Sequence, residues 1–409
     1  MKKALALILA LAMVFALCAC GQSAAPAASS DNAGSTESAP AAEAAPAPAA
    51  DKGKILYLSN LTSGPAYDFY VGYLTMICNN LGYKFEVVYG DMFNDPAGNL
   101  AAVKNAYTSD VVGLIVCEDG GLGSIMEEYP DLYVVGVLSD MDSVFGENPV
   151  NAAVLQNDHF LGNVSDGLVD PVEQARGYFD EVVARGYKKV SVMNFPVYAY
   201  PKQTAITANF LQMVEEYNKT ASEPIEVVGE PVVLQFSPLE DSYFMEKENQ
   251  DLDAIVGICA GTTFIYPTML AAKANGSINP NMQLITGGFE NDPDLLADCG
   301  DDKTIVYLSI STVESVLWPV AMLDAALSGT MYPDFTGPEI INPGLCVINS
   351  TEEFEAMANN SPIGLTVDIN KAQVQWDDMK DLFISVNPDA TYAGLCSFVQ
   401  ALAVDGYMN

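Results

Sequence analysis

Two short runs of consecutive apolar residues constrain the fold of this 409-residue chain more than any other feature. They span residues 111–117 (VVGLIVC) and 254–260 (AIVGICA), and neither alternates with polar residues. A strand of this kind is buried on both faces, as in a parallel sheet with helices on each side. Both runs are too short to cross a membrane, so the sequence predicts two buried strands in an α/β architecture.

Strands and helices alternate along both halves of the chain. In the first half, we expect strands at 54–59, 85–89, 111–117 and 133–138 and helices at 69–81, 97–109 and 123–128. In the second half, we expect strands at 189–193, 254–260, 283–286 and 305–308 and helices at 204–217, 264–275 and 311–328. Residues 151–155 should form an extended link, and 158–185 should be helical with an interruption at Pro171. This alternation predicts two doubly wound α/β lobes, with a ligand crevice at the carboxyl ends of their strands.

The first fifty residues differ in composition from the rest of the chain. Lys2 and Lys3 precede an apolar stretch and small residues around Cys20, which is the pattern of a secretory signal over residues 1–20. Its end, LCAC, resembles the lipobox of bacterial lipoproteins, in which the cysteine at the position of Cys20 is acylated. Residues 21–52 are rich in Ala, Pro and Ser, so we expect a flexible linker. An ordinary signal peptide and an uncleaved helical anchor are the alternatives.

Charge and residue counts restrict the function. The formal net charge is -36, which makes nucleic acid and anionic lipid poor partners. His159, expected at a helix start, is the one histidine of the chain, and the cysteines show no zinc-binding spacing. Cys117 and Cys259 lie in apolar runs and should behave as small buried hydrophobes. We therefore expect no metal, no cofactor and no catalytic site; acid-pair glycosidase chemistry, which needs no histidine, is the enzymatic alternative.

Several short motifs follow one another in a characteristic order. They are 58–70 (LSNLTSGPAYDFY), 94–97 (NDPA), 111–116 (VVGLIV), 156–162 (QNDHFLG), 186–190 (GYKKV) and 287–290 (GGFE). In this order, behind a lipobox, the chain resembles the bacterial type I periplasmic-binding proteins, the ribose-binding-like receptors of ABC importers. The resemblance implies a monomeric two-lobe clamp with a multi-strand hinge, which closes on a small solute and passes it to a membrane permease. It assigns 53–155 and 309–338 to the first lobe, 156–308 to the second, and 339–409 to an extension packing on the lobes.

The loops after the strands supply the candidate ligand-binding residues. Aromatic faces with hydroxyls and a few carboxylates suit a neutral or cationic solute. Where sugar receptors of this class carry arginine, the chain has Tyr200, Gln203 and Thr204. We expect no basic group in the cleft, so an anionic ligand would lack a counter-charge. The candidates are Tyr67, Phe69, Asp140, Phe195, Tyr198, Thr262, Thr263, Glu290 and Ser309. Core packing of Phe69 and a turn or capping role of Asp140 are the alternatives.

These features predict an extracytoplasmic receptor anchored to the cell membrane through lipid on Cys20. Its ligand is expected to be a sugar or a sugar-like small molecule, delivered to an ABC permease. A nucleoside is an alternative ligand, because aromatic rings stack on bases. A sensor that signals to a membrane protein is the alternative of another class, because lobe closure serves either output.

Overall fold

The computed structural model describes residues 51–90, 95–146, 149–167, 170–197 and 200–408. Within them, no helix is both long and apolar enough to cross a membrane. The expected signal, Cys20, the linker as far as residue 50, and Tyr198 lie outside the described residues.

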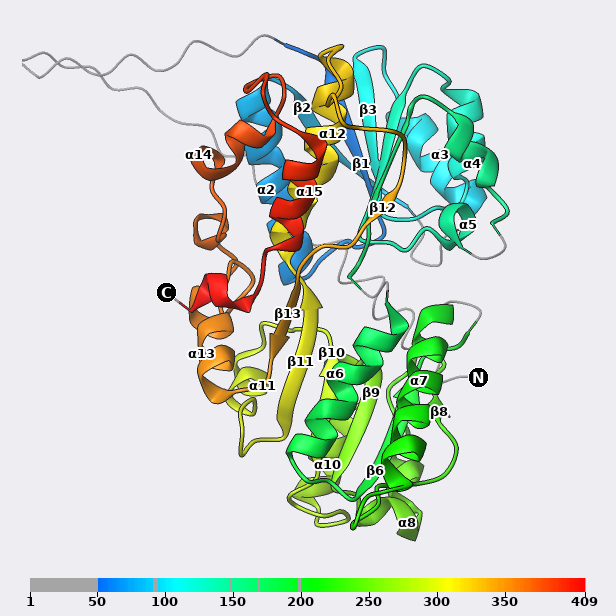
Figure 1. Ribbon diagram of the computed structural model, residues 1–409, viewed down its shortest axis with the longest axis vertical. Helices are drawn as coiled ribbons and strands as arrows, with labels where there is room; N and C mark the ends of the chain where they lie inside the picture. The colour runs from blue at the N-terminus through cyan, green and yellow to red at the C-terminus, as the bar shows by residue number, and fades with distance from the viewer. Residues whose placement is uncertain (1–50, 91–94, 147–148, 168–169, 198–199, 409) are drawn as a thin grey trace, which may run out of the picture. The chain divides into compact units, whose positions relative to one another are not determined.

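A parallel sheet forms the centre of the first half of the body (Figure 1). Its strand order is β12-β5-β4-β3-β1-β2. The strands are β1 (Lys54–Ser59), β2 (Lys84–Tyr89), β3 (Val111–Val116), β4 (Tyr133–Val137), β5 (Phe160–Val164) and β12 (Ile340–Ile341). The helices between them are α2 (Pro65–Leu81), α3 (Pro96–Ala106), α4 (Leu122–Glu128), α5 (Asp142–Phe145) and the 3-10 helix η1 (Ala152–Gln156). We call this sheet and the helices packed on it the first lobe.

The side chains of β1 explain why helices cover both faces of this sheet. Ile55 and Tyr57 belong to a hydrophobic core with α2 and α12 (Leu317–Leu327), whereas Leu56 and Leu58 belong to a second core with α3 and α4. Successive side chains of a strand point to opposite faces, so an uninterrupted apolar strand supplies both cores. Figure 1 shows α2 and α12 on one side of the sheet and α3 and α4 on the other.

The second lobe is built on a sheet of order β13-β11-β10-β9-β6-β7, with β8 also paired to β6. Its strands are β6 (Lys189–Asn194), β7 (Glu226–Val227), β8 (Val232–Val233), β9 (Ala254–Ala260), β10 (Gln283–Gly287), β11 (Ile305–Ser311) and β13 (Leu345–Ile348). Only β13 is antiparallel among these described strands. The helices are α6 (Pro171–Ala184), α7 (Pro201–Asn218), η2 (Asp241–Met245), α8 (Lys247–Gln250), α9 (Gly261–Phe264), α10 (Tyr266–Ala274) and α11 (Pro293–Ala297).

Three segments connect the two lobes. The chain crosses between β5 and α6, between β11 and α12 through η3 (Val313–Val316), and between β12 and β13. These crossings confirm the expected doubly wound lobes joined by a multi-strand hinge. They also show that both sheets gain their last strand from the C-terminal segment.

The C-terminal segment, residues 339–408, has contacts with both lobes. Besides β12 and β13 it contains α13 (Thr351–Asn360), η4 (Ile369–Lys371), α14 (Trp376–Met379), η5 (Lys380–Leu382), α15 (Tyr392–Gln400) and η6 (Val404–Tyr407). On the first lobe, the Tyr73 hydroxyl donates to the Val374 carbonyl at 2.7 Å. At the hinge, the buried carboxylate of Glu314 accepts hydrogen bonds from the Tyr407 hydroxyl at 2.8 and 3.0 Å and from the backbone N–H of Gln373 at 3.0 Å.

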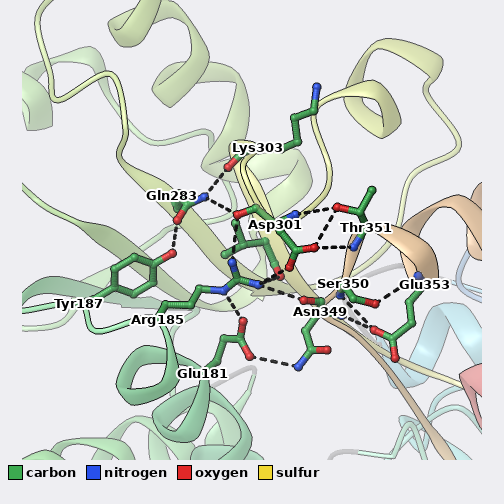
Figure 2. Close-up of polar contacts among 11 residues, drawn as sticks. Glu181, Arg185, Tyr187, Gln283, Asp301, Lys303, Asn349, Ser350, Thr351 and Glu353 are labelled. Atoms are coloured by element: carbon green, nitrogen blue, oxygen red, sulfur yellow. Dashed lines mark hydrogen bonds and ion pairs between the residues drawn. The ribbon is translucent and has the colours of Figure 1, made fainter.

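On the second lobe, one arginine holds the start of α13 (Figure 2). Arg185, which follows α6, forms an ion pair with Glu181 and donates to the carbonyls of Val306 at 3.2 Å and Asn349 at 3.0 Å. Next to it, the Asp301 carboxylate accepts the backbone N–H of Thr351 at 3.1 Å. Charge-assisted hydrogen bonds of this kind are stronger than neutral ones, so this cluster fixes α13 to the second lobe.

Several expectations about the chain between the lobes were wrong. Residues 160–164 form strand β5, not a helix, and the helix begins at Pro171, where the Asp170 side chain caps it. The second lobe therefore does not begin at residue 156, because β5 pairs with β4 in the first sheet. His159 precedes β5 and packs on Tyr133 with ring centroids 4.5 Å apart. Residues 152–156 form η1 instead of an extended link. Two expected helices also differ: the one at 264–275 is interrupted at Ile265, and the one at 311–328 begins as α12 only at Leu317.

Candidate functional site

A cavity of about 380 Å³ lies at the carboxyl ends of strands from both sheets. Its size suits a small ligand, because small-molecule pockets usually enclose 300–1,000 Å³. Asn60, Cys117, Leu138 and Asp166 line it from the first lobe and the crossing after β5. The second lobe and the other crossings supply residues at the ends of β9, β10 and β11 and on α6 and α7: Tyr178, Gln203, Ile206, Ile258, Cys259, Ala260, Gly287, Gly288, Phe289, Ser309, Ile310 and Ser311. The parallel topology explains this position, because it brings the carboxyl ends of the strands to one edge of each sheet.

Three tyrosines are among the polar residues that line the cavity. Tyr57 and Tyr70 lie in the first lobe and Tyr178 on α6. Burial raises the pKa of Tyr178 to about 12 and raises the pKa of the other two as well. All three therefore stay protonated at neutral pH and keep an O–H group that donates one hydrogen bond and also accepts.

Two of these hydroxyls already have partners in the protein. The Tyr178 and Ser309 hydroxyls lie 3.3 Å apart, and the Cys117 thiol donates to the Tyr57 hydroxyl at 3.0 Å. Cys117 and Cys259 are 4% and 6% exposed, which confirms their expected burial, and burial raises the pKa of each thiol to about 12. They are therefore neutral thiols that face the cavity from opposite lobes. The six cysteines of the described residues are all free.

Carboxylates gather at the edge of the cavity around one lysine. Lys202 on α7 forms an ion pair with Asp140, with Nζ 2.6 Å from Oδ1. Burial raises the pKa of Asp140 to about 7, the nearby charge of Asp166 adds to this rise, and Lys202 opposes it. Burial and then Asp140 raise the pKa of Asp142. Among the described residues, no lysine or arginine lines the cavity itself; the Lys202 ammonium lies beside it, and the Asp140 carboxylate already pairs with that ammonium.

Among the candidate residues from the sequence, Ser309 lines the cavity. Thr262 lies close by: its hydroxyl is 3.4 Å from where a Cβ on Gly288 would stand, and it is buried with no hydrogen-bond partner in the described part of the chain. The Thr263 hydroxyl donates to Glu290 at 2.9 Å, and both side chains lie outside the cavity lining. A ligand role for Thr262, Thr263 and Glu290 stays a prediction.

The aromatic candidates lie in other surroundings. Phe69 is fully buried and stacks on Tyr73 at 4.8 Å, as in the core-packing alternative. The Tyr67 hydroxyl lies 2.6 Å from that of Tyr89. Phe195 packs against Phe236 and Phe264, each with ring centroids 5.0 Å away, and its backbone N–H donates to Gln203. None of the three lines the cavity.

Most of the residues that line or border the cavity were not among the candidates, and three of them show the physical reasons. Asp166 follows β5, which the sequence analysis took for a helix, so the end of a strand went unrecognised. Tyr178 lies in the middle of a helix, where a tyrosine usually packs on the sheet. Lys202 follows Pro201 at the start of α7, and nothing in its spacing indicates a partner 62 positions earlier in the chain.

Comparisons with known proteins place this architecture among solved structures. No protein-family model matches the chain, and no curated protein sequence matches it. A carbohydrate-transporter solute-binding protein from Agrobacterium radiobacter, in complex with D-arabinose, is similar with a TM-score of 0.52 and 13% identity, over 75% of this chain and 99% of that one. The glucose-galactose-binding protein GanP from Geobacillus stearothermophilus gives 0.52 and 13%, over 73% and 97%. The dimeric Lac repressor gives 0.51 and 11%, over 72% and 96%.

At these identities the similarity establishes the fold. The body has the periplasmic-binding-protein type I fold, as expected from the sequence. Since solute-binding proteins and a repressor both have it, the function has to be argued from the site.

Proposed function

We propose that this protein is an extracytoplasmic, lipid-anchored receptor that captures a small neutral solute, a sugar or a sugar-like molecule, and delivers it to an ABC importer. The observation that carries the proposal is the cavity between the carboxyl ends of both sheets, lined by aromatic rings and hydroxyl groups. The solute-binding proteins named above, which are described with D-arabinose or as glucose-galactose-binding, support the class of ligand.

The chemistry of the walls favours a polyhydroxylated ligand. Tyr57, Tyr70 and Tyr178 offer hydroxyls that donate and accept, and Ser309 and Asp166 add a hydroxyl and a carboxylate. A sugar presents alternating C–H faces and O–H groups, which match aromatic faces and such donors. An anionic ligand would meet an excess of carboxylates, since Lys202 is already paired with Asp140.

The remaining parts of the proposal come from the sequence. The lipobox at Cys20 supports a lipid anchor, and the linker at 21–52 would hold the body away from the membrane. Delivery to a permease follows from the class of receptor that the chain resembles. We also propose that the receptor acts as a monomer and without catalysis.

Two alternatives would use the same cavity. A nucleoside would use the same aromatic and acidic groups. A sensor would close on its ligand in the same way and signal to a membrane protein instead of passing the solute to a permease. A DNA-binding role like that of a repressor is disfavoured, because a net charge of -36 repels the phosphate backbone.

A thermal-shift screen of the protein against sugars, polyols, nucleosides, amino acids and polyamines tests the proposal. A ligand that binds only the folded state stabilises it by about 2.7 kcal/mol at a hundred times its Kd. Tyr178→Phe should then weaken binding of the identified ligand, measured by titration calorimetry, by about 1 kcal/mol. Tyr107→Phe is the matched control, because Tyr107 stacks on Tyr129 outside the cavity. Stabilisation by amino acids alone, or equal effects of the two variants, would contradict the proposal.

A further inference from the structure

One ion pair connects the two lobes beside the cavity. Asp140 follows β4 in the first sheet, whereas Lys202 lies in the first turn of α7, which packs on the second sheet. The Lys202 Nζ and Asp140 Oδ1 atoms are 2.6 Å apart. The Lys202 side chain is 20% exposed and the Asp140 side chain 17%. Among the ion pairs of the described residues, this is the only one whose partners belong to elements of different sheets.

The first lobe presents several acids to this lysine. Asp166, which follows β5, and Asp142 on α5 both interact electrostatically with Asp140, and Asp119 interacts with Asp142. Burial raises the pKa of Tyr200, the residue before α7, and the charges of Glu118 and Asp166 add to this rise. Lys202 is thus the cation that α7 brings to a group of carboxylates from the first lobe and the crossing after β5. Moving α7 against these carboxylates without a cation would bury negative charge with no counter-charge, which is costly.

We propose that Lys202 is the positioning residue that lets the two lobes close over the ligand, because its ammonium group neutralises the Asp140 carboxylate as α7 approaches the first lobe. The inference rests on the proposed function, since a receptor has to open and close around its solute. It concerns closure itself, whatever the ligand.

The proposal has a defined pH dependence. With the two lobes in contact at this point, burial and the charge of Asp166 raise the pKa of Asp140 to about 7 from its ordinary value of 3.8, and separating the lobes would hydrate the carboxylate and lower its pKa again. A raised pKa in the closed form means that closing takes up a proton, so closure weakens as the pH rises towards 7. Lys202 opposes this weakening because it stabilises the ionised carboxylate. Without Lys202, the lobes should open most at alkaline pH, and the difference from the wild type should shrink in acid.

The native thiols provide a readout that needs no ligand. Cys117 and Cys259 line the cavity from opposite lobes, so opening exposes both to solvent. Cys78 and Cys346, each 0% exposed, lie outside the cavity lining and report on unfolding. The experiment is alkylation of the purified protein with N-ethylmaleimide at pH 8 and pH 5.5, followed by peptide mass mapping of each thiol. Every variant is compared with the wild type at the same pH, because alkylation itself speeds up with pH.

Lys202→Met should raise the alkylation rates of Cys117 and Cys259 severalfold at pH 8 and much less at pH 5.5, because the lost ammonium group matters most when the Asp140 carboxylate is ionised. Cys78 and Cys346 should keep their rates, and Lys202→Arg should behave as the wild type. Lys219→Met is the matched control, because Lys219 lies at the opposite end of α7 and its one ion pair among the described residues is with the neighbouring Glu216.

Unchanged rates in Lys202→Met would overturn the proposal. So would an increase at all four thiols, which indicates loss of folding, or equal increases in the Met and Arg variants, which would show that charge is not the cause. A solute that binds while the thiols of Lys202→Met stay protected refutes the role of Lys202 and leaves the receptor function standing. Thiols that respond as expected, in a protein that binds no solute of the screen, support the role of Lys202 and count against the proposed function.

Discussion

Replacing Tyr407 with phenylalanine should show how the C-terminal segment is held at the hinge. The Tyr407 hydroxyl donates to both oxygens of the Glu314 carboxylate, at 2.8 and 3.0 Å, and both residues are buried. Among the described residues, no cation pairs with this carboxylate, so it depends on its hydrogen-bond donors. The variant keeps the ring and its packing and removes one donor.

The expected loss of stability is about 2 kcal/mol, since a hydrogen bond to a charged group contributes roughly 1.5–3 kcal/mol. Burial raises the pKa of Glu314, and the Tyr407 hydrogen bond lowers it in opposition. The hydroxyl therefore stabilises the ionised form, and its contribution is present when Glu314 is ionised and is lost as the pH falls through its raised pKa. The deficit of the variant should therefore shrink as the pH is lowered through the pKa of Glu314.

Urea unfolding monitored by tryptophan fluorescence measures this loss. The chain has two tryptophans: Trp318 on α12 in the first-lobe core and Trp376 on α14 in the C-terminal segment. Tyr107→Phe is the control. Tyr107 is an exposed tyrosine of the first lobe, so this variant should change the free energy of unfolding by less than about 0.5 kcal/mol. A loss below about 0.5 kcal/mol in Tyr407→Phe, or a loss that grows as the pH is lowered, would refute the reasoning.

Three further predictions concern other parts of the protein. Arg185→Ala should lower the free energy of unfolding by about 3 kcal/mol, because it removes the donor to the Asn349 carbonyl and leaves Glu181 without its ion-pair partner. Limited proteolysis should then cut the variant near α13, and an uncut chain would contradict this. Glu290→Ala should weaken ligand binding by about 1–3 kcal/mol with the fold intact, as judged by calorimetry and circular dichroism, and normal binding would remove Glu290 from the site. Phe69→Ala should lower the free energy of unfolding by about 3–5 kcal/mol, because Phe69 is fully buried, and a stable variant would contradict its core position.

The sequence predicted the buried strands best. Residues 254–260 form β9 with the expected bounds, because an apolar run of that length between turn residues fits a strand covered on both faces. β5 was missed because Gly162, at φ +104°, and Asn163 interrupt its apolar residues. Asn163 is buried and its side-chain N–H donates to the Ser139 carbonyl, so a tertiary contact holds in the strand a residue that locally disfavours it.

The site was predictable in place and less so in its residues. The ends of strands correctly gave Ser309 on the cavity wall. Tyr178 and Lys202 lie on helices, and the direction of a helical side chain depends on how the helix packs. The pairing of Lys202 with Asp140 also requires the fold to bring two distant segments together, and spacing along the chain carries no such information.

The late position of β12 and β13 in the chain affects the order in which the protein is completed during synthesis. Each sheet has an edge that stays unpaired until residues 340–348 have been made, and Glu314 has no partner until Gln373 and Tyr407 follow. Contacts between segments this far apart form slowly, because the intervening chain has to be ordered first. A nascent chain that still lacks its final seventy residues is therefore an incomplete structure at both lobes and at the hinge.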